Sequence, residues 1–188
     1  MEKDNIQLSP IERQLLINQY KILNMLSEGE GTHKDNQNKI EALSSGYELH
    51  YQDALEDVQE DTLSTEQCRE ILDILEMFRG IIYSYQALER ENKLKELTRK
   101  MVHFEGFDGN NETSEMLYVR YFIKDLERYS EIEEFSGKNA DYNSHAHRLP
   151  TYRRMLSKWN NFRHTLPNPY LMTEDQIKEL ITGYNPMW

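Results

Sequence analysis

Apolar residues recur along most of this chain with the spacing of amphipathic helices. The pattern is clearest between Cys68 and Arg90, where large apolar side chains cover roughly 200° of the helical wheel, which predicts a central helix with neighbours on most sides. The capping sequence Ser64-Thr65-Glu66-Gln67 marks its start, and we expect it to continue, in more polar form, to Lys100. Its apolar residues are Ile71, Leu72, Ile74, Leu75, Phe78, Ile81, Ile82, Tyr85 and Leu88.

A first helix is predicted from Ser9 to about Ser27. Ser9-Pro10-Ile11-Glu12 places a hydroxyl at the N-cap, proline at the first helical position and a carboxylate at the third. The helix has two apolar faces, so we expect it to contact more than one neighbour. One face carries Ile11, Leu15, Ile22, Met25 and Leu26, and the other carries Leu16, Tyr20 and Leu23.

The region between these two helices is less regular. Glu28 to His33 reads as a glycine-containing polar loop, followed by a shorter helix from Lys34 to Ser45 that Gly46 ends. Tyr47 to Gln59 is ambiguous, because the alternation of apolar residues at its start fits a short extended piece before a helical turn.

The C-terminal half predicts three more helices. The turn Phe107-Asp108-Gly109 precedes a helix to about Glu134, with Asp108 or Asn111 as its cap. A Gly-, Asn- and Ser-rich loop then leads to a helix from Pro150 to Phe162. The last helix opens with the capping box at Thr173 and ends at Gly183.

Together these elements predict an all-α, multihelical single domain over residues 1–188. We expect about six to seven helices, with room for one short extended segment after Gly46, and a flexible stretch at 1–8. The composition agrees: the 188 residues include twelve Tyr but only three Val, and β-branched residues are what a large sheet would need.

Composition also bears on location. The single cysteine, Cys68, cannot form a disulfide within the chain, which indicates a reducing compartment. The N-terminus lacks the apolar run of a secretory signal, and no stretch approaches the ~20 apolar residues of a membrane span. We therefore expect a cytoplasmic protein with no membrane partner.

The net charge of −11 disfavours nucleic acid as a partner, but charge is unevenly distributed. Residues 47–77 hold ten acids and one base, whereas residues 142–173 hold no acid at all. The basic segment, His145 to Arg163, has two interpretations. It docks on acidic surface of this chain or a second copy, or it binds an anion such as a phosphate or a nucleotide. The anion-binding candidates are His145, Arg148, Arg153, Arg154 and Lys158.

No catalytic signature is present, so we predict no catalytic residue, metal or cofactor. His145 and His147 are weak metal candidates, because two imidazoles need further ligands. Glu105, Asp108 and Glu112 flank the turn at Phe107, where an acid–base pair is conceivable. For Asp108, capping of the following helix is the simpler role.

Four residues are candidates for a subunit interface. Asn18 and Gln19 lie mid-helix among apolar residues, where a partly buried amide must find hydrogen-bond partners. Tyr20 follows them directly, and Trp159 lies in the basic segment. With the wide apolar faces, they indicate a homo-oligomer and a protein partner.

Several segments, taken in order along nearly the whole chain, form a recognisable set. They are Arg13 through Leu26, Cys68-Arg69 with Ile71, Asp73, Ile74, Glu76 and Met77, Gly106-Phe107-Asp108, Glu112, Tyr118-Val119-Arg120, Asn143-Ser144-His145, and Tyr152 through Leu156 with Trp159. In these residues the chain resembles the YfbU-like family of bacterial proteins. The resemblance implies a bacterial, cytoplasmic, multihelical single domain, and it brings no accepted activity and no catalytic residues.

The sequence leaves two functions open. The first is a non-enzymatic helical module that self-associates and binds another macromolecule. The alternative is a binding protein or hydrolase-type enzyme for a small phosphorylated or nucleotide ligand, held by the basic segment.

Overall fold

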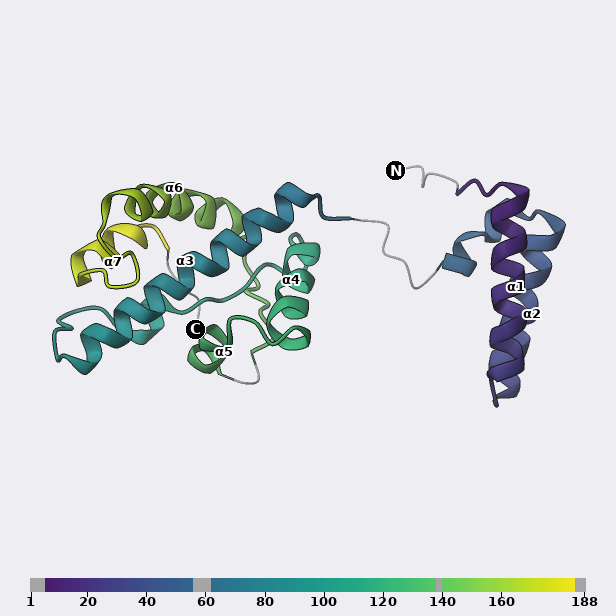
Figure 1. Cartoon of the computed structure of the whole chain (residues 1–188), viewed down its shortest axis with the longest axis horizontal. Coiled ribbons are helices and arrows are strands. Elements are labelled where there is room, and N and C mark those ends of the chain that lie inside the picture. The colour runs from purple at the N-terminus through teal and green to yellow at the C-terminus, as the bar shows by residue number, and fades with distance from the viewer. Residues whose placement is uncertain (1–5, 56–61, 138–139, 185–188) are drawn as a thin grey trace. The chain divides into compact units, whose positions relative to one another are not determined.

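The computed structural model of this chain is all-α, as the sequence predicts (Figure 1). It describes residues 6–55, 62–137 and 140–184. Within these ranges the extended backbone forms one isolated parallel bridge, between Phe107 and Asn143, and no strand. None of the described helices is both long and apolar enough to cross a bilayer. Of the stretch 1–8, which we expected to be flexible, residues 1–5 lie outside the described part of the chain.

Contacts divide the chain into two compact units, residues 1–60 and 61–188. Each unit has its own cluster of buried apolar side chains. The N-terminal cluster is small and consists of Ile17, Leu43, Tyr51 and Ala54. The C-terminal cluster is much larger and includes most of the aromatic side chains.

The N-terminal unit is a helical hairpin of α1 (Pro10–Leu26) and α2 (Glu30–Ser45), which lie side by side in Figure 1. The capping box at Ser9 is confirmed. The polar stretch expected to be a loop is instead the first turn of α2, with Gly29 as its N-cap. Helical hydrogen bonds and packing on α1 thus prevail over the low helix propensity of Gly31.

The extended segment expected after Gly46 is absent from the described residues. Two short 3₁₀ turns take its place, Glu48–His50 and Gln52–Leu55. They bury Tyr51 and Ala54 against the hairpin, which a straight strand would not do. The rest of that ambiguous region, residues 56–59, lies outside the described part.

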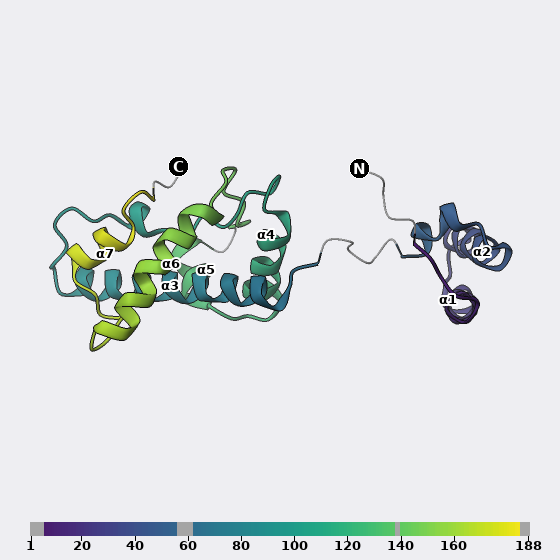
Figure 2. The ribbon, with the colours of Figure 1, turned by 90° about the horizontal axis from the view of Figure 1, so that it is seen from above.

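The C-terminal unit is built around α3 (Thr65–Arg90). Four helices surround it, and Figure 2 shows α6 crossing α3: α4 (Thr113–Arg120), α5 (Ser130–Ser136), α6 (Leu149–Thr165) and α7 (Glu174–Leu180). The capping boxes predicted at Ser64 and Thr173 are both confirmed. The expected continuation of α3 to Lys100 is wrong, because the chain turns at Asn92, whose φ is 51°.

The long helix predicted from Asp108 to Glu134 is also divided. A π-helical turn, Tyr121–Asp125, follows α4, and the chain reverses before α5 begins. Tyr129 adopts the left-handed conformation with φ of 55° at the break. Its ring lies 4.0 Å from the Arg79 guanidinium carbon, so a contact with α3 stabilises the interruption.

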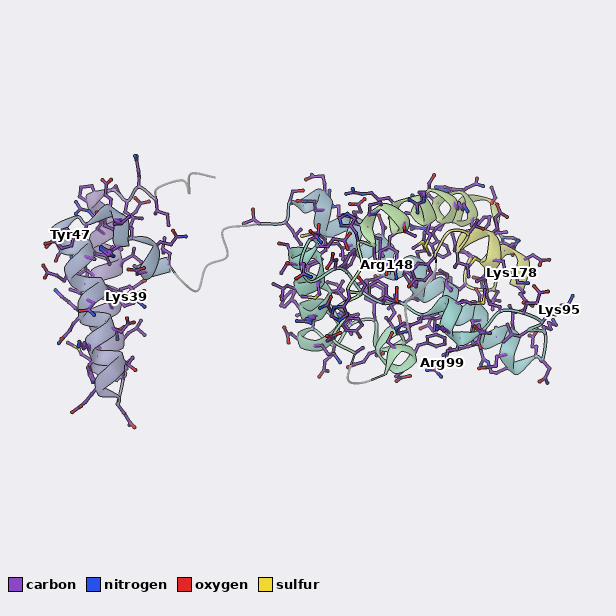
Figure 3. All side chains as sticks on the ribbon, turned by 180° about the vertical axis from the view of Figure 1, so that it is seen from behind. Lys39, Tyr47, Lys95, Arg99, Arg148 and Lys178 are labelled. Carbon is purple, nitrogen blue, oxygen red and sulfur yellow. The ribbon has the colours of Figure 1, made fainter. Side chains whose placement is uncertain are left out.

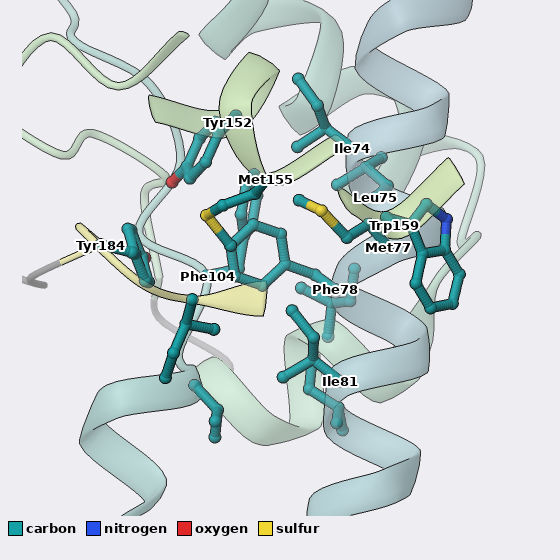
Figure 4. Packing of buried hydrophobic residues seen from close by; sticks show 14 of the residues in the cluster. Ile74, Leu75, Met77, Phe78, Ile81, Phe104, Tyr152, Met155, Trp159 and Tyr184 are labelled. Atoms are coloured by element: carbon teal, nitrogen blue, oxygen red, sulfur yellow. The ribbon is translucent and has the colours of Figure 1, made fainter. Parts of the chain in front are cut away.

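Aromatic side chains fill the centre of this unit (Figure 4). The Phe78 ring lies 4.9 Å from that of Phe104 and 5.3 Å from that of Tyr152, centroid to centroid. On the other side of α3, Trp159 covers Gly80, where an added Cβ would lie 2.3 Å from the indole ring. Gly80 therefore lets α6 approach α3 closely.

Candidate functional site

The segment Gly106-Phe107-Asp108-Gly109 is a structural joint with residues 142–149, and we call these contacts the joint. Phe107 donates its N–H to the carbonyl of Tyr142 and accepts one from Ser144, both at 3.0 Å. Gly106 has φ of +90°, and a Cβ there would lie 1.9 Å from the Tyr142 carbonyl oxygen. Only glycine permits this approach of the two backbones.

Glu112 holds the start of α6 from the other side of the joint. Its buried carboxylate accepts the backbone N–H of Arg148 at 3.0 Å and of Leu149 at 2.7 Å. It also accepts the N–H of Asp108 at 2.9 Å. A carboxylate at a helix N-terminus satisfies free donors and suits the helix dipole. Glu112 is therefore a long-range cap, a role that the sequence analysis did not assign to it.

Asp108 stabilises the turn rather than the following helix, whose N-cap is Glu112. Its carboxylate accepts hydrogen bonds from the Asn111 side chain at 2.5 Å and from the backbone of Asn110 at 3.0 Å. These bonds, that from Asn111 first, lower the pKa of Asp108 below its usual value. The expectation that Asp108 or Asn111 caps a helix is thus corrected.

Glu105 and Arg148 form a buried ion pair beside the joint. Their side chains are 5% and 10% exposed, and 2.5 Å separates the carboxylate from the guanidinium group. The Tyr184 ring lies 5.6 Å from the Arg148 guanidinium carbon, and Figure 3 shows Arg148 among the elements of this unit. Arg148 is therefore engaged inside the fold and is not presented to an anion in solvent.

The other basic-segment candidates do not converge on one point. Arg153 forms a two-pronged pair with Glu70 of α3, at 2.7 and 2.8 Å, and Arg153 in turn lowers the pKa of Glu70. Lys158 donates to the backbone carbonyl of Glu179 at 2.6 Å. Arg154 is exposed on α6, and His145 is exposed in the preceding loop. Arg148 and Arg153 thus contact carboxylates of the same chain, whereas Lys158 contacts a backbone carbonyl.

The two histidines are not joined by a ligand set. His147 lies 3.5 Å from the Glu112 carboxylate, while the backbone of His145 donates to Asn143. Across residues 6–55, 62–137 and 140–184, no three His, Cys, Asp or Glu side chains are grouped so that they could hold a metal ion.

The N-terminal unit presents a different kind of site, a broad apolar surface on α1. We call it the α1 face and define it by its six large side chains. Their exposed fractions are 75% for Ile11, 58% for Leu15, 57% for Ile22, 51% for Leu23, 84% for Met25 and 74% for Leu26.

The opposite side of α1 holds the hairpin together. Ile17 is buried there, and Arg13 donates to the carbonyl of Leu43 at 3.2 Å. Tyr20 donates its hydroxyl to the carbonyl of Ala54 at 2.8 Å, with the Lys39 ammonium 5.5 Å from its ring. One side of α1 is thus used by the hairpin, and the α1 face is left over.

The interface candidates fall in different places. Asn18 and Gln19 are exposed on α1, whereas Tyr20 is half-buried inside the hairpin. Trp159 is fully buried in the C-terminal core, so its indole is not available to a partner. The sequence carried a signal for the α1 face, because two apolar faces on one helix exceed what a single neighbour covers.

Comparison with known proteins places these features in a family. The model of the YfbU domain matches residues 6–183, and so spans both units. The chain belongs to the YfbU family. It is 34% identical over 154 residues to the UPF0304 protein MJECS11 of Methanocaldococcus jannaschii, an alignment that covers 82% of this chain and 88% of the relative. The YfbU match includes α1 with its exposed face as well as the joint, so both are parts of the family domain.

Proposed function

We propose that this YfbU-family chain is a non-enzymatic helical module of the cytoplasm that self-associates and binds another macromolecule. The observation that carries the proposal is the α1 face, whose six apolar side chains are each more than half exposed. Contiguous apolar surface of this kind on a protein marks an interaction site.

The energy available from the α1 face supports association. The six exposed fractions amount to about four complete side chains, and burying one Leu, Ile or Met contributes about 2 kcal/mol, so each chain could gain roughly 8 kcal/mol. Loss of translational and rotational freedom offsets a large part of this gain. The remainder is in the range of moderate, reversible association.

The groups that could have performed acid–base chemistry already serve the fold, which also supports a non-enzymatic role. Glu112 binds the start of α6, Asp108 binds its own turn, and Glu105 pairs with Arg148. The contacts of the basic segment likewise give the anion-binding alternative no specific observation in its favour, because Arg153 pairs with the Glu70 carboxylate and Lys158 donates to the backbone carbonyl of Glu179.

Light scattering over a range of protein concentrations tests the proposal. We expect the mass of the wild-type chain to rise with concentration and the double variant Leu15→Glu/Ile22→Glu to stay monomeric. Leu171→Glu is the matched control, because Leu171 is 62% exposed in the C-terminal unit and outside the α1 face. A wild-type chain that stays monomeric throughout, with the same behaviour as the double variant, would contradict self-association.

A further inference from the structure

Four side chains of the α1 face form, together with Asn18, a seam with the spacing of a coiled coil. Ile11, Leu15, Asn18, Ile22 and Met25 alternate in steps of four and three residues, which keeps them in one line along a helix that faces a partner helix. None of the five is charged, so the net charge of −11 does not place like charges along this line. Asn18 is the central and sole polar position of the seam.

The seam reads nearly the same in both directions from its centre. Two aliphatic residues, Leu15 and Ile11, lie on one side of Asn18, and Ile22 and Met25 lie on the other. A second copy of α1 can therefore match the aliphatic residues whether it runs parallel or antiparallel. Such self-complementarity is what a two-fold symmetric interface requires.

The Asn18 side chain selects the partner. Buried against an aliphatic surface, an amide loses hydrogen bonds with water and destabilises the complex. A second Asn18 removes this penalty, because each amide has both donors and an acceptor. Gln14 already donates to the Asn18 oxygen at 3.0 Å, which orients the amide on the helix surface. A single asparagine in such a seam fixes the register of the two helices.

The area is sufficient for a dimer of moderate affinity. The side chains on or beside the seam are Ile11, Leu15, Ile22, Met25 and Leu26, and their exposed fractions amount to about 3.5 complete side chains. At roughly 100 Å² each, they remove about 700 Å² of apolar surface from water over two copies. Asn18 and the flanking Gln14, Gln19 and Lys21 bring the total toward the ~1,000 Å² of a specific interface.

We propose that α1 pairs with α1 of a second copy of this chain, with the two Asn18 side chains against each other at the centre. This inference rests on the proposed function, since it names the partner of the α1 face.

Disulfide trapping tests the pairing in the full-length chain. In a Cys68→Ser background, Asn18→Cys places a thiol at the centre of the seam, within disulfide reach of its copy. Asn38→Cys is the matched control, because Asn38 is also exposed but lies on α2. We expect about tenfold more disulfide-linked dimer for Asn18→Cys than for Asn38→Cys under mild oxidation.

A second variant tests the pairing without an introduced thiol. Asn18→Leu removes the buried amide, and we expect it to tighten association about tenfold in light scattering. Disulfide trapping of Ile11→Cys, alone and mixed with Met25→Cys, then determines whether the two α1 helices run parallel or antiparallel. Trapping of Ile11→Cys by itself indicates parallel helices, and trapping only in the mixture indicates antiparallel ones, both consistent with paired Asn18 residues.

The outcomes separate this inference from the proposed function. If Leu15→Glu/Ile22→Glu abolishes association but Asn18→Cys is trapped no better than Asn38→Cys, then the α1 face binds another occupant; the pairing is overturned and the proposed function stands. If the wild-type chain is monomeric and the α1 substitutions change nothing, both are overturned.

Discussion

Replacement of Glu112 should destabilise the C-terminal unit more than its position on a short helix suggests. Its carboxylate accepts three backbone N–H groups, from Asp108, Arg148 and Leu149. Each hydrogen bond to a charged group contributes about 1.5 to 3 kcal/mol, and loss of the carboxylate leaves buried donors without an acceptor. Because water reaches part of the opened site, we expect Glu112→Ala to lower the free energy of unfolding by about 3 to 5 kcal/mol.

Glu112→Gln separates charge from hydrogen bonding. The glutamine oxygen can still accept from Arg148 and Leu149, but its amide nitrogen would face the N–H of Asp108, donor against donor. We therefore expect about half the loss of the alanine variant.

Urea unfolding followed by tryptophan fluorescence measures these losses. Trp159 is buried in the C-terminal core, and a Trp188→Phe background makes it the sole tryptophan. Glu134→Ala is the control: Glu134 is an exposed glutamate of α5, and we expect a change within ~0.5 kcal/mol. A loss below ~1 kcal/mol for Glu112→Ala would refute the argument that Glu112 caps α6 across the joint.

Three further results follow from the C-terminal unit. Gly106→Ala should lower the free energy of unfolding by about 3 kcal/mol or more, because the added Cβ would clash with Tyr142. Gly137 also has a positive φ but open space around it, so Gly137→Ala should lower the free energy of unfolding by only ~1 to 2 kcal/mol. Equal losses in urea unfolding would exclude the clash with Tyr142. Hydrogen bonds, first that from the backbone N–H of Glu96, lower the pKa of Glu174 to about 2. The contribution of this carboxylate to stability is therefore complete above pH 4.5 and is lost as the pH falls through about 2. Acid unfolding of Glu174→Gln should lack that loss of stability. Burial lowers the pKa of His103 from 6.5 to about 4. As the pH falls from 6.5 to about 4, the unfolded chain binds a proton at this ring that the folded chain does not, so the free energy of unfolding should decrease over this range. An NMR titration midpoint near pH 6.5 for the His103 ring would contradict its burial.

Local signals in the sequence were sufficient for three of the helix starts. Ser9, Ser64 and Thr173 each form the capping box that four consecutive residues encode. The family was also recognisable, because its residues lie in order along nearly the whole chain. These features depend on neighbours in sequence, which a single chain displays directly.

Tertiary contacts decided the features that the sequence did not reveal. The break before α5 depends on Tyr129 packing against Arg79, fifty residues earlier in the chain, and no local pattern records that contact. Glu112 looked like a possible acid or base because its backbone donors come from the distant start of α6. In the candidate site, the apolar pattern predicted the α1 face, but burial alone distinguished it from the face that α2 covers.

The small core of the N-terminal hairpin has a consequence for the degradation of the protein in the cell. Among its described residues, the core cluster consists of four buried apolar side chains with five partly buried ones packed against them, which is a small core for a unit that folds alone. Under the proposed self-association, a second copy that binds only the ordered form would stabilise this unit by mass action. At low concentration of the protein, more N-terminal units would be unfolded and open to proteolysis, and at high concentration association would protect them. The rate of degradation would then depend on the expression level of the protein.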